Sequence, residues 1–139
     1  MHIDHVGLNV GNLDAMSAWY AHAFELSLAK PFQVEPLNLK GVFLTNTHGF
    51  AIELLERKGG RRTELAPDTV PNALLSHGYS HICFRVRDVA LVHARLIENG
   101  AREIMSVRPA PEPGVTMSYL ADPEGNLIEL IDRQGPVLP

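Results

Sequence analysis

The sequence predicts an α+β fold in which two βαβββ modules follow one another along the chain. A shift of 76 residues aligns the two halves of this 139-residue sequence. Each half has one β-type segment, an amphipathic helical segment and then further β-type segments. A stretch with glycines and prolines at residues 58–77 separates the halves. We therefore expect one domain over residues 1–139, with module 1 at 1–57, module 2 at 78–134 and a tail at 135–139.

The 76-residue shift aligns polar residues as well as apolar ones. His5 aligns with His81 and Glu53 with Glu129, so each copy carries one imidazole and one carboxylate. The same shift aligns further pairs, namely Phe43-Leu44 with Tyr119-Leu120, Gly49 with Gly125, and Arg57 with Arg133. A duplicated unit of this kind can bring two nitrogens and two oxygens to one divalent metal ion.

Composition places the chain among ordinary soluble domains. Apolar residues make up 45% and charged residues 20% of the sequence, and the net charge is −4. Lys and Arg are scattered, so we expect neither nucleic acid nor a membrane surface as a partner. The N-terminus lacks the features of a signal peptide, and no segment reaches the roughly 18 to 20 apolar residues of a membrane span. Cys83 is the sole cysteine, which excludes an internal disulfide, and we expect a cytoplasmic location.

The first module begins with a predicted strand at residues 3–10, which ends at a Gly-Asn turn. An amphipathic helix is predicted at residues 15–24, with Asp14 as its cap. Its apolar stripe has three- and four-residue spacing and consists of Met16, Trp19, Tyr20 and Phe24. We expect this stripe to pack in the core against a sheet.

Three more strands are predicted in the first module. They cover residues 32–35, 39–45 and 50–56, and a turn at residues 46–49 joins the last two. The prolines at positions 31 and 36 break the regular pattern before and after the first of them.

The second module repeats this order. A strand at residues 81–87 precedes a helix at 89–99, whose apolar side consists of Val92, Leu96 and Ile97 and which ends at Gly100. The remaining strands are predicted at 102–107, 116–120 and 127–132. A proline-rich loop at residues 109–114 has the character of a lid.

Side chains alternate along a strand, which predicts the face that each polar group occupies. His5 shares its face with Gly7 and Asn9, and His81 shares its face with Cys83 and Arg85. Glu53 and Glu129 each lie between apolar neighbours that point to the opposite face. A sheet curved into a trough would gather His5, Glu53, His81 and Glu129 on its concave side.

This donor set predicts one divalent metal ion. Two imidazoles and two carboxylates suit Zn, Ni, Co, Mn or Fe(II), and the remaining coordination positions would be open to water or substrate. The other histidines have no partner at a repeating spacing and are predicted to face solvent; they are His2, His22, His48, His77 and His93. A lone thiol without a base is typical of a packing residue, so Cys83 is not predicted to react.

Four motifs carry a resemblance to a known family. They occupy residues 5–10 (HVGLNV), 51–54 (AIEL), 81–86 (HICFRV) and 122–130 (DPEGNLIEL). The chain resembles the vicinal oxygen chelate superfamily, which includes glyoxalase I, methylmalonyl-CoA epimerase, extradiol dioxygenases and the fosfomycin and bleomycin resistance proteins. The resemblance implies two βαβββ modules that form a curved mixed sheet around a metal site. It also implies that His5, Glu53, His81 and Glu129 match the metal ligands of the glyoxalase I type.

The predicted activity is that of a metal-dependent lyase or isomerase. A substrate with oxygens on adjacent carbons would lose a proton to Glu129, or to Glu53 on the opposite side. Arg85 is expected to hold an anionic group of the substrate or to pair with a neighbouring carboxylate. Asn9 occupies a substrate-binding position that is often Arg in glyoxalase I, which argues against glutathione. A glutathione adduct, an acyl-CoA and a catechol therefore remain alternative small-molecule substrates.

Two other functions are compatible with the motifs. His5, His81 and Glu129 alone form the two-histidine, one-carboxylate set of Fe(II) extradiol dioxygenases, although Glu53 would occupy a position that oxygen chemistry needs. A resistance protein of the same fold would bind a drug without turnover. We expect a homodimer, because pairing protects exposed strand edges, and the predicted linker permits a metal site within one chain or across two.

Overall fold

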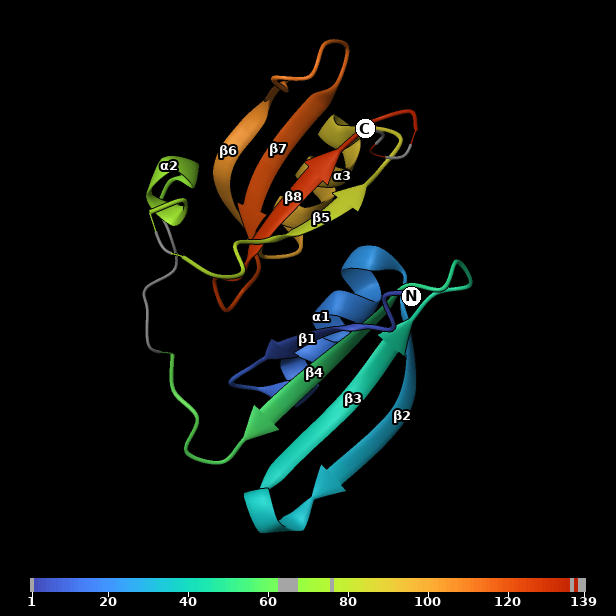
Figure 1. The fold of residues 1–139 in the computed structure, drawn as a ribbon, viewed down its shortest axis with the longest axis vertical. Coiled ribbons are helices and arrows are strands. Elements are labelled where there is room, and N and C mark those ends of the chain that lie inside the picture. Colours follow the sequence, from blue (N-terminus) through green and yellow to red (C-terminus); the bar gives the residue numbers. More distant parts are fainter. Residues whose placement is uncertain (1, 63–67, 76, 136, 138–139) are drawn as a thin grey trace. The chain divides into compact units, whose positions relative to one another are not determined.

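The computed structural model describes residues 2–62, 68–75, 77–135 and 137, which form two units. Unit 1 spans Met1–Thr63 and unit 2 spans Glu64–Pro139. Each unit contains one four-stranded mixed sheet with a helix packed against one face (Figure 1). The predicted α+β class with two βαβββ modules is confirmed.

Unit 1 has the strand order β1-β4-β3-β2. Its elements are β1 (Val6–Asn9), α1 (Leu13–Phe24), β2 (Ser27–Val34), a 3-10 turn η1 (Glu35–Leu37), β3 (Leu39–Thr45) and β4 (Ala51–Arg57). Strand β1 runs parallel to β4, and the other neighbours are antiparallel. Helix α1 packs against β3 and β4, so the central strands of the sheet are covered on one face.

Unit 2 has the equivalent order β5-β8-β7-β6. Its elements are the short helix α2 (Val70–Ala73), β5 (Ile82–Arg85), α3 (Val89–Glu98), β6 (Arg102–Pro109), β7 (Thr116–Ala121) and β8 (Leu127–Ile131). Strand β5 is parallel to β8, and the remaining pairs are antiparallel. The 76-residue sequence repeat is thus also a repeat of topology.

Helix α1 begins earlier than the apolar stripe predicts. Its cap is Asn12, whose side chain accepts a hydrogen bond from the Ala15 amide, so the prediction of Asp14 as the cap is wrong. Asn12 has the extended backbone that a cap requires, whereas Asp14 lies in the first helical turn. Met16 and Tyr20 of the predicted stripe are fully buried beneath the sheet.

Strand β2 is longer than predicted because it accommodates a proline. It extends across Pro31, and its register with β3 shifts between Ala29 and Phe32. Lys30, inside this irregularity, has a positive φ of 39°. An edge strand needs hydrogen bonds on one side only, which lets it contain a proline at a bulge.

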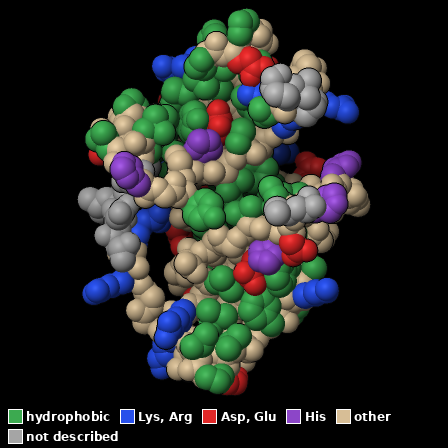
Figure 2. Space-filling model, viewed as in Figure 1, with side chains coloured by type: hydrophobic (Ala, Val, Ile, Leu, Met, Phe, Trp, Pro, Cys, Tyr) green, Lys and Arg blue, Asp and Glu red, His purple; other side chains and the backbone are tan. Residues whose placement is uncertain are grey.

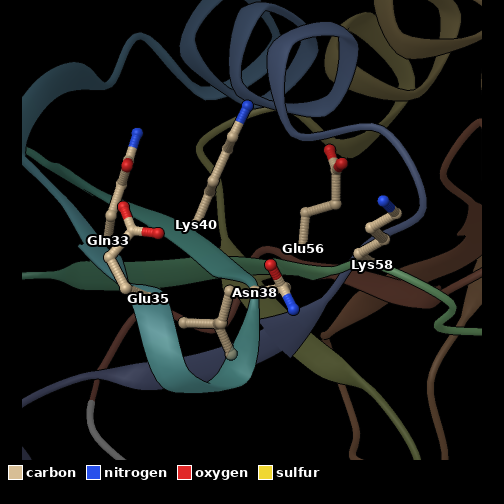
Figure 3. A pocket seen from close by; sticks show the side chains of 7 residues that line it. Gln33, Glu35, Asn38, Lys40, Glu56 and Lys58 are labelled. Carbon is tan, nitrogen blue, oxygen red and sulfur yellow. The ribbon is translucent and has the colours of Figure 1, made fainter.

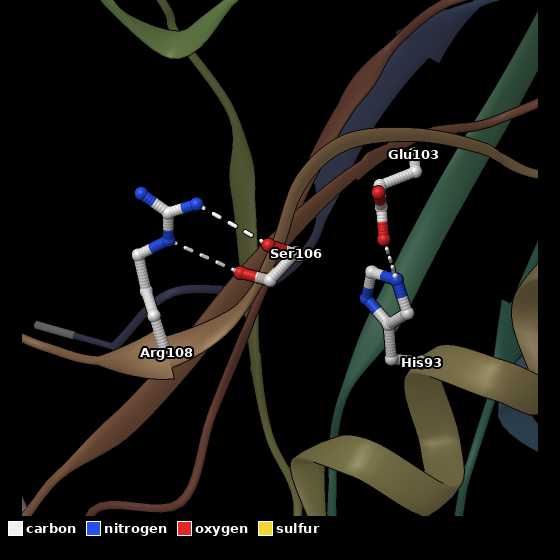
Figure 4. A network of polar contacts seen from close by, with 4 residues as sticks. All are labelled: His93, Glu103, Ser106 and Arg108. Carbon is white, nitrogen blue, oxygen red and sulfur yellow. Dashed lines mark hydrogen bonds and ion pairs between the residues drawn. The ribbon is translucent and has the colours of Figure 1, made fainter.

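Helix α3 buries Val89, His93 and Leu96, at the four- and three-residue spacing of one helix face. The predicted member Ile97 is 38% exposed instead. The prediction that His93 faces solvent is wrong, since this residue is only 7% exposed. The His93 ring fits this partly apolar position because its Nε2 contacts Glu103 Oε2 on β6 at 2.8 Å (Figure 4).

The surface carries charges of both signs. On the face shown in Figure 2, Lys and Arg side chains are dispersed among acidic and apolar ones. No helix within the described ranges is long and apolar enough to cross a bilayer.

We predict that the Leu96→Ala substitution lowers the free energy of unfolding by about 2–5 kcal/mol, because it leaves a cavity beneath α3. Leu96 is fully buried, whereas Leu91 on the same helix is 68% exposed. The matched Leu91→Ala variant should change the free energy by less than about 0.5 kcal/mol. Urea unfolding followed by circular dichroism measures both, and equal effects would contradict this packing of α3.

Candidate metal centre

Unit 1 brings a histidine and a glutamate together through the pairing of its parallel strands. His5 directly precedes β1, and Glu53 is the third residue of β4. Gly7 is the register partner of Glu53, which brings His5 near the carboxylate. The distance from His5 Nε2 to Glu53 Oε2 is 3.5 Å. The rings of His5 and Phe43 pack in a T-shaped arrangement, with centroids 5.2 Å apart and an interplanar angle of 84°.

Unit 2 repeats this arrangement. His81 directly precedes β5, and Glu129 is the third residue of β8. Cys83 is the register partner of Glu129, and the distance from His81 Nε2 to Glu129 Oε2 is 2.9 Å. Tyr119 takes the place of Phe43, with ring centroids 5.2 Å from His81 and an interplanar angle of 79°. We call His5 with Glu53, and His81 with Glu129, the two half-sites.

The far nitrogen of each imidazole is engaged by the preceding residue. His5 Nδ1 lies 2.8 Å from Asp4 Oδ2, and His81 Nδ1 lies 3.0 Å from Ser80 Oγ. Such contacts fix the ring orientation of metal-binding histidines and leave Nε2 for the metal. The hydrogen bond to Asp4 raises the pKa of His5, partly opposed by burial, and the Glu53 charge adds to the increase. Asp4 and Ser80 are themselves 76 residues apart, but they differ in residue type, so the repeat alone did not predict a role for them.

The spacing within each half-site fits two neighbouring ligands of one metal ion. Two ligands at right angles, with bonds of about 2.0–2.2 Å, lie roughly 2.8–3.1 Å apart. The His81–Glu129 distance of 2.9 Å falls in this range, and the His5–Glu53 distance of 3.5 Å is slightly longer. Imidazole and carboxylate donors also suit borderline divalent ions. Among the described residues, no group of three or more His, Cys, Asp or Glu side chains is positioned to hold a metal ion.

Glu129 lies in a more polar environment than the alternation pattern indicates. Burial raises its pKa, but hydrogen bonds with His81, Cys83 and Tyr119 outweigh burial, and the net pKa is lowered. Burial and the neighbouring Glu129 charge raise the pKa of Cys83 to about 12. The same two causes raise the pKa of Tyr119. Cys83, predicted as a packing residue, is exposed and is the register partner of the candidate ligand Glu129.

The two predicted substrate-binding residues occupy equivalent strand positions. Asn9 ends β1 and Arg85 ends β5, and both are exposed. Asn9 lies two residues after Gly7, the register partner of Glu53, and Arg85 lies two residues after Cys83, the register partner of Glu129. Because side chains alternate along a strand, both residues lie on the same face of their sheet as the half-site. Their roles toward a substrate remain predictions.

An ion pair holds the predicted lid loop of unit 2. Arg133 donates from Nε and Nη2 to Glu112 Oε2, at 2.8 and 2.6 Å. Glu112 belongs to the loop between β6 and β7, and Arg133 follows β8. The contact therefore ties this loop to the strand that carries Glu129.

A separate hollow of about 270 Å³ lies in unit 1 (Figure 3). Its lining consists of Gln33, Glu35, Asn38, Leu39, Lys40, Glu56 and Lys58. Glu56 lies three residues from Glu53 on β4 and so faces the opposite side of the sheet, where it accepts a hydrogen bond from the Leu13 amide at 2.7 Å. The hollow is therefore distinct from the half-site.

A comparison with protein families agrees with this architecture. The model described as the Glyoxalase/Bleomycin resistance protein/Dioxygenase superfamily matches residues 2–130. The chain belongs to this superfamily.

Individual superfamily members share the fold at low sequence identity. Lactoylglutathione lyase of Arabidopsis thaliana is 27% identical over 139 residues, which cover 95% of this chain and 44% of the relative. Glyoxalase I from Zea mays has a TM-score of 0.77 at 21% identity, over 96% of this chain and 45% of that one. A glyoxalase family protein from Bacillus cereus has a TM-score of 0.78 at 22% identity, over 97% and 95% of the two chains. The chain thus spans about half the length of the two plant proteins.

The environment of Cys83 raises the pKa of its thiol, which lowers the reactivity expected of it toward alkylating agents. Because the pKa of the folded thiol is about 12, its thiolate fraction at pH 8 should be on the order of 1,000-fold smaller than in urea-unfolded protein, whose thiol titrates near 8.5. Alkylation by iodoacetamide should therefore be slower in the folded protein, although by a smaller factor, because a thiolate of higher pKa is the stronger nucleophile. Glu129→Gln removes the neighbouring charge, which lowers the pKa and should speed the reaction. Alkylation rates in metal-free protein measure this, and equal rates in folded and unfolded protein would contradict it.

Proposed function

We propose that the protein is a metal-dependent lyase or isomerase of the glyoxalase I type. The observation that carries this proposal is the duplicated half-site, in which the His–Glu distance is 2.9 Å in unit 2, within the range for neighbouring ligands of one ion, and 3.5 Å in unit 1, slightly longer. His5, Glu53, His81 and Glu129 would together hold one Zn, Ni, Co, Mn or Fe(II) ion. When bound, such an ion acts as a Lewis acid that polarises a substrate carbonyl.

The two carboxylates carry the proton in this proposal. The C–H bond next to the substrate carbonyl breaks, its electron pair remains on the substrate as an enediolate, and the proton moves to a carboxylate oxygen. The carboxylate then returns the proton to the adjacent carbon, so no oxidant or reductant is needed. Glu129 and Glu53 are the two candidate bases, each beside an imidazole whose orientation is fixed by Asp4 or Ser80.

The substrate is a small molecule with oxygens on adjacent carbons. The named activity of the Arabidopsis relative makes a glutathione hemithioacetal the first compound to test. Asn9 offers no positive charge for a glutathione carboxylate, so acyl-CoA epimers and catechols are tested beside it. Arg85, exposed at the end of β5, is the proposed contact for an anionic group.

We further propose a homodimer in the cytoplasm. The plant relatives have about twice the length of this chain. Two copies of this chain would therefore have about the length of one plant relative. Pairing of copies would also protect edge strands.

We predict that purified protein contains a divalent metal and that His5→Ala and His81→Ala each remove most of it. Each substitution deletes one of the four donors, which should weaken metal binding by at least about tenfold. His22→Ala, at an exposed position of α1, is the control and should keep the metal. Elemental analysis measures occupancy, and turnover is assayed with methylglyoxal hemithioacetals, acyl-CoA epimers and catechols. Unchanged metal content in both variants would contradict the proposed ligands.

A further inference from the structure

Unit 1 contains a hollow that the proposed function does not use. Its volume is about 270 Å³, and all seven of its lining residues belong to this unit. Glu56 in the lining and Glu53 of the half-site are three residues apart on β4, so they point to opposite faces of the sheet. The hollow and the half-site therefore lie on different sides of one sheet.

The floor of the hollow is a row of polar side chains across three strands. Gln33 on β2 pairs with Lys40 on β3, and Lys40 pairs with Glu56 on β4. Register partners lie on the same face of a sheet, and Figure 3 shows these three side chains pointing the same way. The Leu13 amide, at the start of α1, donates to Glu56 at 2.7 Å. The row thus lies at the end of the sheet where α1 begins.

The turn between β2 and β3 supplies another part of the lining. Glu35 begins the 3-10 turn η1, and Asn38 follows this turn with a left-handed backbone, at a φ of 49°. The Asn38 amide donates to the Glu35 carbonyl, and the Lys58 amide donates to the Asn38 carbonyl, both at 3.0 Å. These backbone hydrogen bonds fix the positions from which the Glu35 and Lys58 side chains extend.

Three charged side chains of the lining are available to a ligand. Lys40, Lys58 and Glu35 are exposed, and within the described ranges their side chains form no hydrogen bond or ion pair. Glu56 differs from them, because it is half-buried and accepts the Leu13 amide hydrogen. The hollow thus offers two ammonium groups and one carboxylate.

Unit 2 shows that the duplicated scaffold does not need these three charges. Uncharged residues stand at the equivalent positions, namely Pro111 for Glu35, Thr116 for Lys40 and Gln134 for Lys58. The turn itself is repeated, since Gly114, the equivalent of Asn38, also has a positive φ of 75°. The carboxylate with a backbone partner is repeated too: Asp132, the equivalent of Glu56, accepts the Thr116 amide hydrogen at 2.6 Å. The acid with a structural partner therefore occurs in both units, and the three charges without one occur only in unit 1.

We propose that the hollow of unit 1 is a binding site for a small zwitterion, a molecule with one carboxylate and one ammonium group, as in a free amino acid or dipeptide. The carboxylate of the ligand pairs with the ammonium groups of Lys40 and Lys58, and its ammonium group pairs with Glu35. The amide side chains of Gln33 and Asn38 can donate or accept hydrogen bonds beside these charges.

The balance of charges favours a zwitterion over a simple ion. The lining contains two Lys and two Glu, so its formal net charge is zero. A simple anion would be attracted by the lysines and repelled by Glu35, whereas a ligand with both signs gains from each. The volume lies just below the roughly 300 Å³ at which pockets for drug-sized ligands begin, which suits a smaller molecule. Because the charges are exposed, we expect a dissociation constant on the order of 1 mM.

Backbone amide chemical shifts of the isotope-labelled protein test this site directly. Glycylglycine is the zwitterionic probe, acetate carries its carboxylate alone, and methylammonium carries its ammonium group alone. Glycylglycine should shift the amide signals of residues 33–40 and 56–58, and it should bind at least about threefold more tightly than either single-charge probe.

Variants that install the residues of unit 2 test the two lysines. Lys40→Thr and Lys58→Gln should each weaken glycylglycine binding about three- to fivefold, because each removes one exposed ion pair. Arg87→Gln removes an exposed cation of unit 2 and should bind the probe as the wild type does. Circular dichroism melting should show that all three variants fold, since the changes are at the surface.

Three results would overturn the inference. Acetate binding as tightly as glycylglycine would refute a zwitterionic ligand, and wild-type affinity in a Lys40→Thr, Lys58→Gln double variant would refute the assigned contacts. Unchanged amide signals of residues 33–40 and 56–58 at millimolar glycylglycine would refute the site itself. Each of these results leaves the proposed function intact, because the half-site lies on the other face of the sheet.

Discussion

The parallel pairing of the first and last strands of each unit is the constraint on which the candidate site depends. Glu53 pairs with Gly7, which is two residues after His5, and Glu129 pairs with Cys83, which is two residues after His81. The strand pairing therefore brings each carboxylate close to a histidine. A slip of one residue in either register would turn the glutamate to the opposite face of its sheet. The packed helix on that face would then meet a charge, and the apolar neighbours of the glutamate would face solvent.

Duplication of this pairing explains both the similarity and the difference between the units. The imidazole–aromatic contact recurs with the same 5.2 Å separation, at Phe43 in one unit and Tyr119 in the other. A single hydroxyl distinguishes these two rings, and Cys83 has a thiol-bearing side chain where Gly7 has none. Both differences place a polar group at a register position opposite Glu129. The duplicated scaffold therefore carries different side chains around its two glutamates.

Much of this architecture follows from local patterns in the sequence. The repeat and the apolar periodicities predicted every strand and both long helices, because period and spacing are local properties. Two errors arose where the outcome depends on contacts between elements. Buried His93 has a polar partner on another element, since its Nε2 lies 2.8 Å from Glu103 Oε2 on β6, and periodicity does not reveal such a partner. The position of Cys83 opposite Glu129 depends in the same way on strand pairing, which brings residues 83 and 129 together.

The most direct measurement of the central claim is a crystal structure of the metal-loaded protein with anomalous diffraction from the ion. We predict anomalous density bonded to His5 and His81 Nε2 and to carboxylate oxygens of Glu53 and Glu129, at distances of about 2.0–2.2 Å. The four ligands can come from one chain or from two. An ion bound elsewhere, or bound to one half-site while the other half-site lies distant in every copy, would contradict the account.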